Sequence, residues 1–365
     1  MTVTVTVAVL GTGLIGGSIG LALTKAGLTV RGFDADREAA ERAHTLGAIA
    51  SVADSVADAV AGADVVIVAV PVGRVAAVVV AALDAGAPAV TDVGSVKAAV
   101  LDTVRAERPA LVARFVGGHP MAGSEQDGLD GADADLFAGA TWVLTPTVDT
   151  DAAAHTAVRG IIGRLGAEVV EVPPEQHDAL VAVVSHVPQL AATTLMNVAA
   201  AGDDEHALLM RLAAGGFRDM TRIAAGHPGI WPDICVANRD AILDALDAYR
   251  ASLDAVRAMV EDGDGQALLA TLERGRRARR NLPTGVRVLG PLAEFRVPVP
   301  DRPAVLAEVT TLAGRLGVNI VDIEIAHSIE GDGGVLVLVV PVSGADALDA
   351  ALTESGYHVS RTDLS

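Results

Sequence analysis

The stretch "VAVLGTGLIGGSIGLALTKAGLTVRGFD", residues 7–34, decides the fold of the N-terminal part of this 365-residue chain. From Val3 to Val9, valine alternates with threonine or alanine, which is the period of a β-strand, and glycines then interrupt the apolar run. Residues 1–6 contain no Lys or Arg, so the positive region of a signal peptide is missing. We therefore expect a strand, a turn and a helix here, and neither a signal peptide nor a membrane anchor.

The turn matches the phosphate-binding pattern G-x-G-x-x-G as "GTGLIG" at residues 11–16. Gly11 allows the tight turn, Gly13 lets the backbone approach a pyrophosphate, and Gly16 lets the helix pack close to the strand. The helix N-terminus adds N–H groups and a partial positive charge. Further expected cofactor contacts lie in the same turn and after a later strand: Leu14, Ile15, Val70 and Pro71.

Asp34 ends the next expected strand, about 20 residues after the glycines, at the place of the acidic residue in this pattern. A carboxylate there accepts a hydrogen bond from a ribose 2′-hydroxyl and repels a 2′-phosphate. The pattern therefore predicts NAD as the cofactor. Arg31 and Arg37 lie nearby and keep NADP open as the alternative.

The composition argues against several kinds of partner. Hydrophobic residues make up 51% and charged residues 20% of the chain, which is typical of a folded globular protein. The formal net charge of -19 would repel a nucleic acid backbone and an anionic membrane surface, so we expect neither. The single cysteine, Cys235, cannot form an internal disulfide, which indicates a reducing cytoplasm.

The chain is too long for one typical core, and its pattern changes along its length. Short β-branched runs alternate with Ala-rich helical segments over residues 1–172, which predicts an α/β domain with a Rossmann-type doubly wound sheet. Helical spacing over residues 173–282 predicts an all-helical second domain. A linker at 283–291 precedes residues 292–365, where the order β-α-β-β-α-β predicts a ferredoxin-like domain.

Four further motifs stand outside the phosphate turn: "DVGSVK" at 92–97, "GGHPMAGSEQDG" at 117–128, "SHVPQ" at 185–189 and "FRDMTRIAAGHPGIWPDICVAN" at 217–238. The first two follow expected strands, which places them at the carboxyl edge of the sheet, where ligands bind. The other two lie in the helical part, which would form the opposite side of the ligand-binding cleft. Together these motifs resemble the prephenate dehydrogenase family, which includes cyclohexadienyl and arogenate dehydrogenases, over about residues 5–282.

The resemblance implies NAD-dependent oxidative decarboxylation of prephenate to 4-hydroxyphenylpyruvate in tyrosine biosynthesis. It implies that His119 is the base or acceptor at the ring hydroxyl, and an ordinary histidine pKa of about 6.5 suits that role. Ser95 would orient His119 or touch the nicotinamide, and Ser124 would assist. Arg222 would position the substrate carboxylates, but it must not hold them so tightly that loss of CO2 is hindered.

His186 matches the first histidine of the family pattern S-H-x-P-H and would contact substrate, whereas Gln189 stands where the second histidine is usual. A neutral amide supplies no positive charge to the side-chain carboxylate of prephenate, so arogenate remains an alternative substrate. His177 and His186 share a helical stretch with no third ligand at useful spacing, and we expect no metal. Lys97 is at an expected helix start and is interpreted as solvated rather than catalytic.

Residues 292–365 resemble an ACT domain through "DRPAVLAEVTTLAGRLGVNIVDIEI" at 301–325, which implies an amino-acid effector such as tyrosine. Ala304 stands where ACT domains usually have glycine. The basic run "RGRRARR" at 274–280 is interpreted as a solvated helix end. The helical part has more apolar surface than its length can bury, which predicts a homodimer through residues 174–282.

Two other functions remain as alternatives. A 3-hydroxy acid dehydrogenase would share the Rossmann and helical halves, but such enzymes use a lysine of the helical half, and residues 174–282 contain none. A non-catalytic sensor would bind NAD and an amino acid and would be indifferent to changes at His119 and Arg222.

Overall fold

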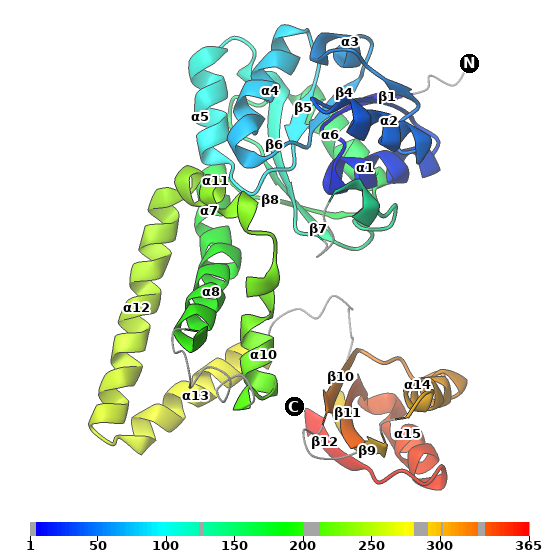
Figure 1. Ribbon diagram of the computed structural model, residues 1–365, viewed down its shortest axis with the longest axis vertical. Helices are drawn as coiled ribbons and strands as arrows, with labels where there is room; N and C mark the ends of the chain where they lie inside the picture. The colour runs from blue at the N-terminus through cyan, green and yellow to red at the C-terminus, as the bar shows by residue number, and fades with distance from the viewer. Residues whose placement is uncertain are drawn as a thin grey trace. The chain divides into compact units, whose positions relative to one another are not determined.

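The computed structural model divides the chain into two compact units, Met1–Asp262 and Gly263–Ser365, each with its own core (Figure 1). It describes residues 5–123, 128–200, 212–280, 291–300, 302–327 and 333–364. The expected linker at 283–291 falls outside the described residues except for its last position.

The first unit is built on an eight-stranded sheet of order β3-β2-β1-β4-β5-β6-β7-β8. Neighbouring strands are parallel except for β6 and β7, which confirms the expected doubly wound, Rossmann-type sheet. The short strand β3 was not expected. The strands are β1 (Thr6–Leu10), β2 (Thr29–Phe33), β3 (Ser51–Val52), β4 (Val65–Val68), β5 (Val90–Asp92), β6 (Phe115–Pro120), β7 (Thr141–Thr145) and β8 (Glu168–Glu171).

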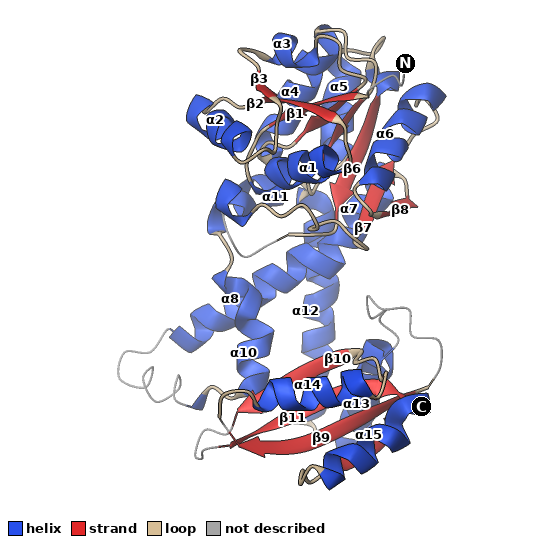
Figure 2. Cartoon of the chain, turned by 90° about the vertical axis from the view of Figure 1, so that its right-hand side faces the viewer, coloured by secondary structure: helices blue, strands red, loops and turns tan. Residues whose placement is uncertain are grey.

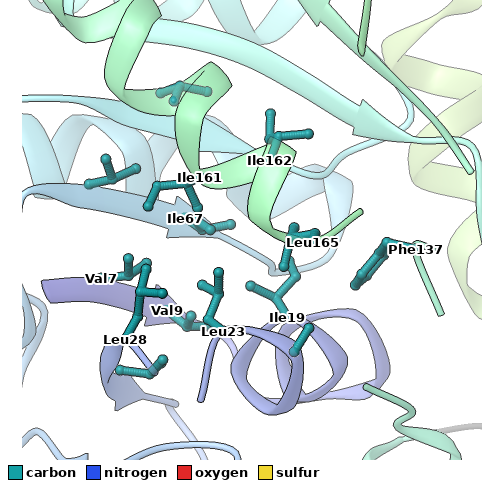
Figure 3. Close-up of a cluster of buried hydrophobic side chains, with 14 of the residues drawn as sticks. Val7, Val9, Ile19, Leu23, Leu28, Ile67, Phe137, Ile161, Ile162 and Leu165 are labelled. Atoms are coloured by element: carbon teal, nitrogen blue, oxygen red, sulfur yellow. The ribbon is translucent and has the colours of Figure 1, made fainter. Parts of the chain in front are cut away.

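Two apolar cores cover the two faces of this sheet. Alternate residues of β1 point to opposite faces, so Val7 and Val9 enter one core while Ala8 and Leu10 enter the other. Figure 3 draws Val7 and Val9 of β1 together with Ile19 and Leu23 of α1, which belong to the same core. The first core contains side chains of α1 (Leu14–Lys25), α2 (Arg37–Thr45), α6 (Ala152–Arg164) and the 3-10 turn Leu129–Gly131. The second contains side chains of α3 (Val56–Val60), α4 (Val72–Asp84), α5 (Ala98–Glu107) and the 3-10 turn Val112–Arg114.

The rest of the first unit is helical, as the sequence predicts. Its longest run joins α7, a π-helical turn at Ala182–His186 and α8, and such turns often occur at functional sites. By length and composition the run Pro174–Ala200 could cross a membrane, a test that core helices of soluble proteins also pass. The elements are α7 (Pro174–Val181), α8 (Val187–Ala200), α10 (Gly215–Thr221), α11 (Trp231–Ala237), α12 (Arg239–Glu261) and 3-10 turns at Arg222–Ala225 and Pro228–Ile230.

The second unit begins with α13 (Gly265–Arg280), and residues 274–279 of its basic end are exposed. An antiparallel sheet of order β10-β11-β9-β12 follows, drawn in red in Figure 2 with two helices on it. Phe295, Val309 and Leu348 lie in the core between sheet and helices. The elements keep the expected β-α-β-β-α-β order: β9 (Leu292–Pro300), α14 (Val305–Arg315), β10 (Asp322–His327), β11 (Gly333–Pro341), α15 (Val342–Glu354) and β12 (Ser360–Leu364).

Candidate active site

The glycine turn after β1 has the shape that a pyrophosphate needs. Gly11 has a φ of +99°, and a Cβ on it or on Gly16 would collide with a backbone carbonyl oxygen. At Gly13, by contrast, an added Cβ would meet no atom within 4 Å. Gly11 and Gly16 therefore permit the strand to pack closely against the helix. Gly13 leaves space through which a phosphate could approach the N-terminus of α1. Leu14 and Ile15 form the first turn of that helix.

A cleft of about 300 Å³ opens beside this turn and could hold a dinucleotide. The Asp34 carboxylate lies at the cleft, where Oδ2 accepts hydrogen bonds from the Thr12 backbone N–H at 2.7 Å and from its hydroxyl at 3.1 Å. Oδ1 accepts from the Asp36 N–H at 3.0 Å. These bonds fix the orientation of the carboxylate, and Oδ1, which accepts one of them, keeps acceptor capacity for a ribose hydroxyl. The cleft also contains Gly11, Gly13, Val70, Pro71 and Arg74.

Ser95 and His119 lie at the same edge of the sheet as this cleft. Strands β4, β5 and β6 are parallel neighbours, so their carboxyl ends meet at one edge. Ser95 is half-buried in the loop after β5, and His119 is half-buried in the last residues of β6. The expectation that Ser95 follows a strand is confirmed, whereas His119 is the second-to-last residue of β6 itself.

A chain of hydrogen bonds runs from His119 into the protein. His119 Nδ1 lies 2.9 Å from His177 Nε2, and His177 Nδ1 lies 2.8 Å from Asp178 Oδ1. The Asp178 carboxylate also accepts from the backbone N–H groups of Lys97 and Ala98, at the N-terminus of α5. Asp178 can only accept while ionised, so His177 carries its proton on Nδ1 and His119 donates from Nδ1 to His177. This tautomer leaves His119 Nε2 as an acceptor.

Lys97 holds the backbone that carries His119. Its side chain is 1% exposed and donates to the Asp92 carboxylate and to the Gly118 carbonyl oxygen, the latter at 2.7 Å. The Gly118 N–H in turn donates to Asp92 Oδ1 at 3.1 Å. The interpretation of Lys97 as a solvated lysine is wrong, because α5 begins against the end of β6 and directs this side chain into the sheet edge.

Burial is the main reason why the rings of both site histidines are neutral at pH 7. Burial lowers the pKa of His119 well below 6.5, and the positive charge of Lys97 lowers it further. Burial also lowers the pKa of His186 to about 4. Desolvation lowers the pKa of the buried Lys97, and the neighbouring Asp92 carboxylate partly offsets this by raising it. A neutral His119 at pH 7 can take up a proton at Nε2.

His186, in the π-helical turn, presents an unused donor. Its ring is 1% exposed, and Nδ1 accepts from the Asn238 amide nitrogen at 3.2 Å. The same amide nitrogen donates to the Asp178 carbonyl oxygen at 2.9 Å, which identifies it as the donor. The proton of neutral His186 is therefore on Nε2, which is buried and has no partner among the described residues. An unpaired buried donor is costly unless a ligand satisfies it.

The remaining residues expected to bind substrate are Arg222, Gln189 and Ser124. Arg222 is exposed at the start of a 3-10 turn that packs against α8, and Gln189 is buried on α8. Ser124 lies outside the described residues.

Three residues that hold His119 were missed in the sequence. His177 was considered only as a metal ligand, and Asp178 and Asp92 were not considered. The available signals were a carboxylate directly after a buried strand, at Asp92, and an adjacent His-Asp pair in an apolar helix. Neither signal predicts that these side chains contact the end of β6, where His119 lies.

Comparison with known proteins connects this arrangement to one family. The family models for the nucleotide-binding domain and the dimerization domain of prephenate dehydrogenase match residues 19–171 and 173–274. The prephenate dehydrogenase of Bacillus subtilis (strain 168) is 37% identical over 339 residues, which cover 91% of each chain. The chain belongs to the prephenate dehydrogenase family. Prephenate dehydrogenase from A. aeolicus, solved with hydroxyphenyl propionate and NAD+, has a TM-score of 0.71 and 29% identity over 77% of this chain and 99% of its own.

Synechocystis arogenate dehydrogenase is also similar in structure, with a TM-score of 0.67 and 28% identity over 76% of this chain and 100% of its own. Membership of the family confirms the expectation of an NAD-dependent dehydrogenase with a Rossmann-type domain followed by a helical domain.

Proposed function

We propose that this member of the prephenate dehydrogenase family converts prephenate to 4-hydroxyphenylpyruvate and CO2 with NAD, a step of tyrosine biosynthesis. The observation that carries the proposal is the hydrogen-bonding state of the His119 ring. Its ring is neutral, its Nδ1 is occupied by His177, and its Nε2 is left as an acceptor at the edge of the sheet that also holds the dinucleotide cleft.

The reaction assigns one task to each group. When bound, the nicotinamide accepts the hydride that leaves the ring carbon bearing the hydroxyl. His119 Nε2 takes the hydroxyl proton as that carbon becomes a carbonyl. The ring carboxylate then leaves as CO2, its bonding electrons pass through the ring to oxygen, and His119 returns the proton to form the phenol. No net proton is released or consumed.

Arg222 and His186 are the proposed substrate-binding groups. The guanidinium of Arg222 suits bidentate pairing with a carboxylate. The Nε2–H of His186 is a buried donor with no described partner, and a polar atom of the substrate would satisfy it. Ser95, and from the sequence alone Ser124, complete the set of residues proposed for the substrate site.

Arogenate is the second candidate substrate because of Gln189. This buried residue is a neutral amide, which suits the zwitterionic side chain of arogenate at least as well as the pyruvyl carboxylate of prephenate. Steady-state formation of NADH with prephenate and with arogenate, measured side by side, distinguishes the two. A higher kcat/KM for prephenate than for arogenate supports the proposal. Turnover of arogenate alone would change the assigned substrate from prephenate to arogenate and leave the proposed reaction, an oxidative decarboxylation, in place. No NADH from either substrate contradicts the proposed function.

We further propose a cytoplasmic homodimer formed through residues 174–282. Val183, Val184 and Met220 are 60%, 62% and 56% exposed, which is costly for apolar side chains on a helical surface. A cleft of about 440 Å³ lined mainly by α8 and α12 lies on the same apolar surface. A second copy packed there would also cover part of the apolar run Pro174–Ala200, which accounts for its apolar composition without a membrane.

The domain limits expected from the sequence remain our proposal, with an ACT domain at 292–365 that binds an amino acid such as tyrosine. The match to the Bacillus subtilis protein covers enough of the chain to extend into this part. A cleft of about 460 Å³ includes Glu308, Arg315 and Tyr357, and an amino acid carries charges that complement such a lining. Tyrosine that shifts neither the melting temperature nor the rate would contradict this assignment.

A further inference from the structure

His177 is a buried titratable residue that the mechanism above does not use. It is 2% exposed, it lies on α7, and it stands between His119 on β6 and the Asp178 carboxylate. The two imidazole rings meet edge to face with centroids 5.1 Å apart. A histidine that only filled space here would not need both ring nitrogens within hydrogen-bond distance of titratable partners.

We propose that His177 is a positioning residue that orients His119 and stores the substrate proton during turnover. This inference rests on the proposed function for the origin of the proton, and on the geometry alone for the arrangement of the two rings. In the resting enzyme His119 donates from Nδ1 to His177 Nε2, and His177 donates from Nδ1 to Asp178. The order of donors fixes both tautomers and presents His119 Nε2 to the substrate.

The transfer conserves atoms and charge. The substrate O–H bond breaks and an N–H bond forms at His119 Nε2, while the Nδ1–H bond of His119 breaks and an N–H bond forms at His177 Nε2. His119 stays neutral, and His177 becomes an imidazolium beside the carboxylate of Asp178. After CO2 has left, the same two transfers run in reverse and deliver a proton to the phenolate oxygen.

Of the two rings, His177 is the one that contacts a carboxylate, that of Asp178. Desolvation and the positive charge of Lys97 lower the pKa of His119 and so disfavour a proton on its ring. Lys97 is itself paired with Asp92. His177 directly contacts Asp178, whose other hydrogen bonds come from the neutral N–H groups of Lys97 and Ala98. The stored proton therefore forms an ion pair in a dry environment, where such pairing is strong.

The central experiment is the His177→Gln variant. Glutamine offers an amide oxygen that can accept from His119 Nδ1, but an amide binds no proton at neutral pH, so orientation is kept and storage is lost. We expect kcat to fall about 100-fold, in the range of a lost acid–base group, while KM and NAD affinity change less than about twofold. His177→Phe, which removes the acceptor as well, should lower kcat further.

A matched control is His155→Gln on α6, where Nε2 lies 3.0 Å from the Glu171 carboxylate near the surface. It makes the same substitution in a histidine that contacts a carboxylate, and it should leave kcat unchanged. Melting curves of each variant identify any loss of folding.

A second measurement needs no substrate. Long-range 15N–1H spectra of the free enzyme, assigned with the histidine variants, should place the ring protons of His119 and His177 on Nδ1. A proton on Nε2 of His119, or a His177→Gln variant with the kcat of the wild type, would overturn the inference. Failure of the wild type to oxidise prephenate or arogenate would contradict the proposed function instead, and the tautomers could still be read.

Discussion

At the scale of the residue, His119 is held from two sides. Its backbone is fixed through Gly118, whose N–H and carbonyl groups bond to Asp92 and Lys97, and its ring is fixed through His177. The sequence motifs were sufficient to predict His119 and the glycine turn as candidate site residues, because each stands in a local pattern. They were insufficient for Lys97, His177 and Asp178, because their roles arise where α5 and α7 meet the end of β6, and no local pattern contains that contact.

The lowered pKa of His119 predicts the pH dependence of kcat/KM. The neutral ring is the active base, and burial with the nearby Lys97 charge disfavours its protonation. Lowering the pH through 6.5 should therefore leave kcat/KM unchanged, and the acid decline should come only at a pH well below that value. Initial rates from pH 4.5 to 8 check this, and an acid limb centred at or above pH 6.5 would contradict it.

Replacing Asp34 should change the choice of cofactor. Asp34→Asn keeps the acceptor for the Thr12 N–H but removes the negative charge that repels a 2′-phosphate. We expect the ratio of kcat/KM for NAD to that for NADP to fall about tenfold, which is worth about 1.4 kcal/mol. Asp36→Asn, which changes the N-cap of α2 two residues away, is the matched control. An unchanged ratio in Asp34→Asn would remove Asp34 from the cofactor site.

At the scale of the element, the strands of the sheet were predictable because each is a short β-branched run, and the β-α-β-β-α-β order of the tail was predictable for the same reason. The two-residue strand β3 was not, since it is too short to show a period. The π-helical turn at Ala182–His186 was not expected either, because its apolar residues continue the helical spacing on both sides.

The start of α14 carries strain that a substitution can release. Ala304 has a φ of +74°, and it is the one residue other than glycine with a positive φ in the described parts of the chain. Ala304→Gly should therefore stabilise the second unit by about 1 kcal/mol. Ala307→Gly, at an exposed position in the first turn of the same helix, should destabilise it by up to about 1 kcal/mol. Denaturant unfolding of the full chain compares the two, and a loss of stability in Ala304→Gly would contradict the prediction.

At the scale of the whole molecule, the proposed homodimer explains why the helical part leaves so many apolar side chains exposed. Val184→Glu would place a charge in the proposed interface, where desolvation without a partner is costly. We expect the wild type to sediment as a dimer and the variant to dissociate at about tenfold higher protein concentration or more, for a cost of about 1.4 kcal/mol. Val148→Glu, at a fully exposed position of the first unit, should remain a dimer. A monomeric wild type would contradict the proposal.

The most direct test of the account compares the wild type with His119→Asn in one assay. Formation of NADH from NAD and prephenate is followed by absorbance, and NAD binding is measured separately by calorimetry. We expect NADH from the wild type and a rate at least about 1,000-fold lower from His119→Asn, with the NAD dissociation constant unchanged. Equal rates from the two proteins would contradict the central claim.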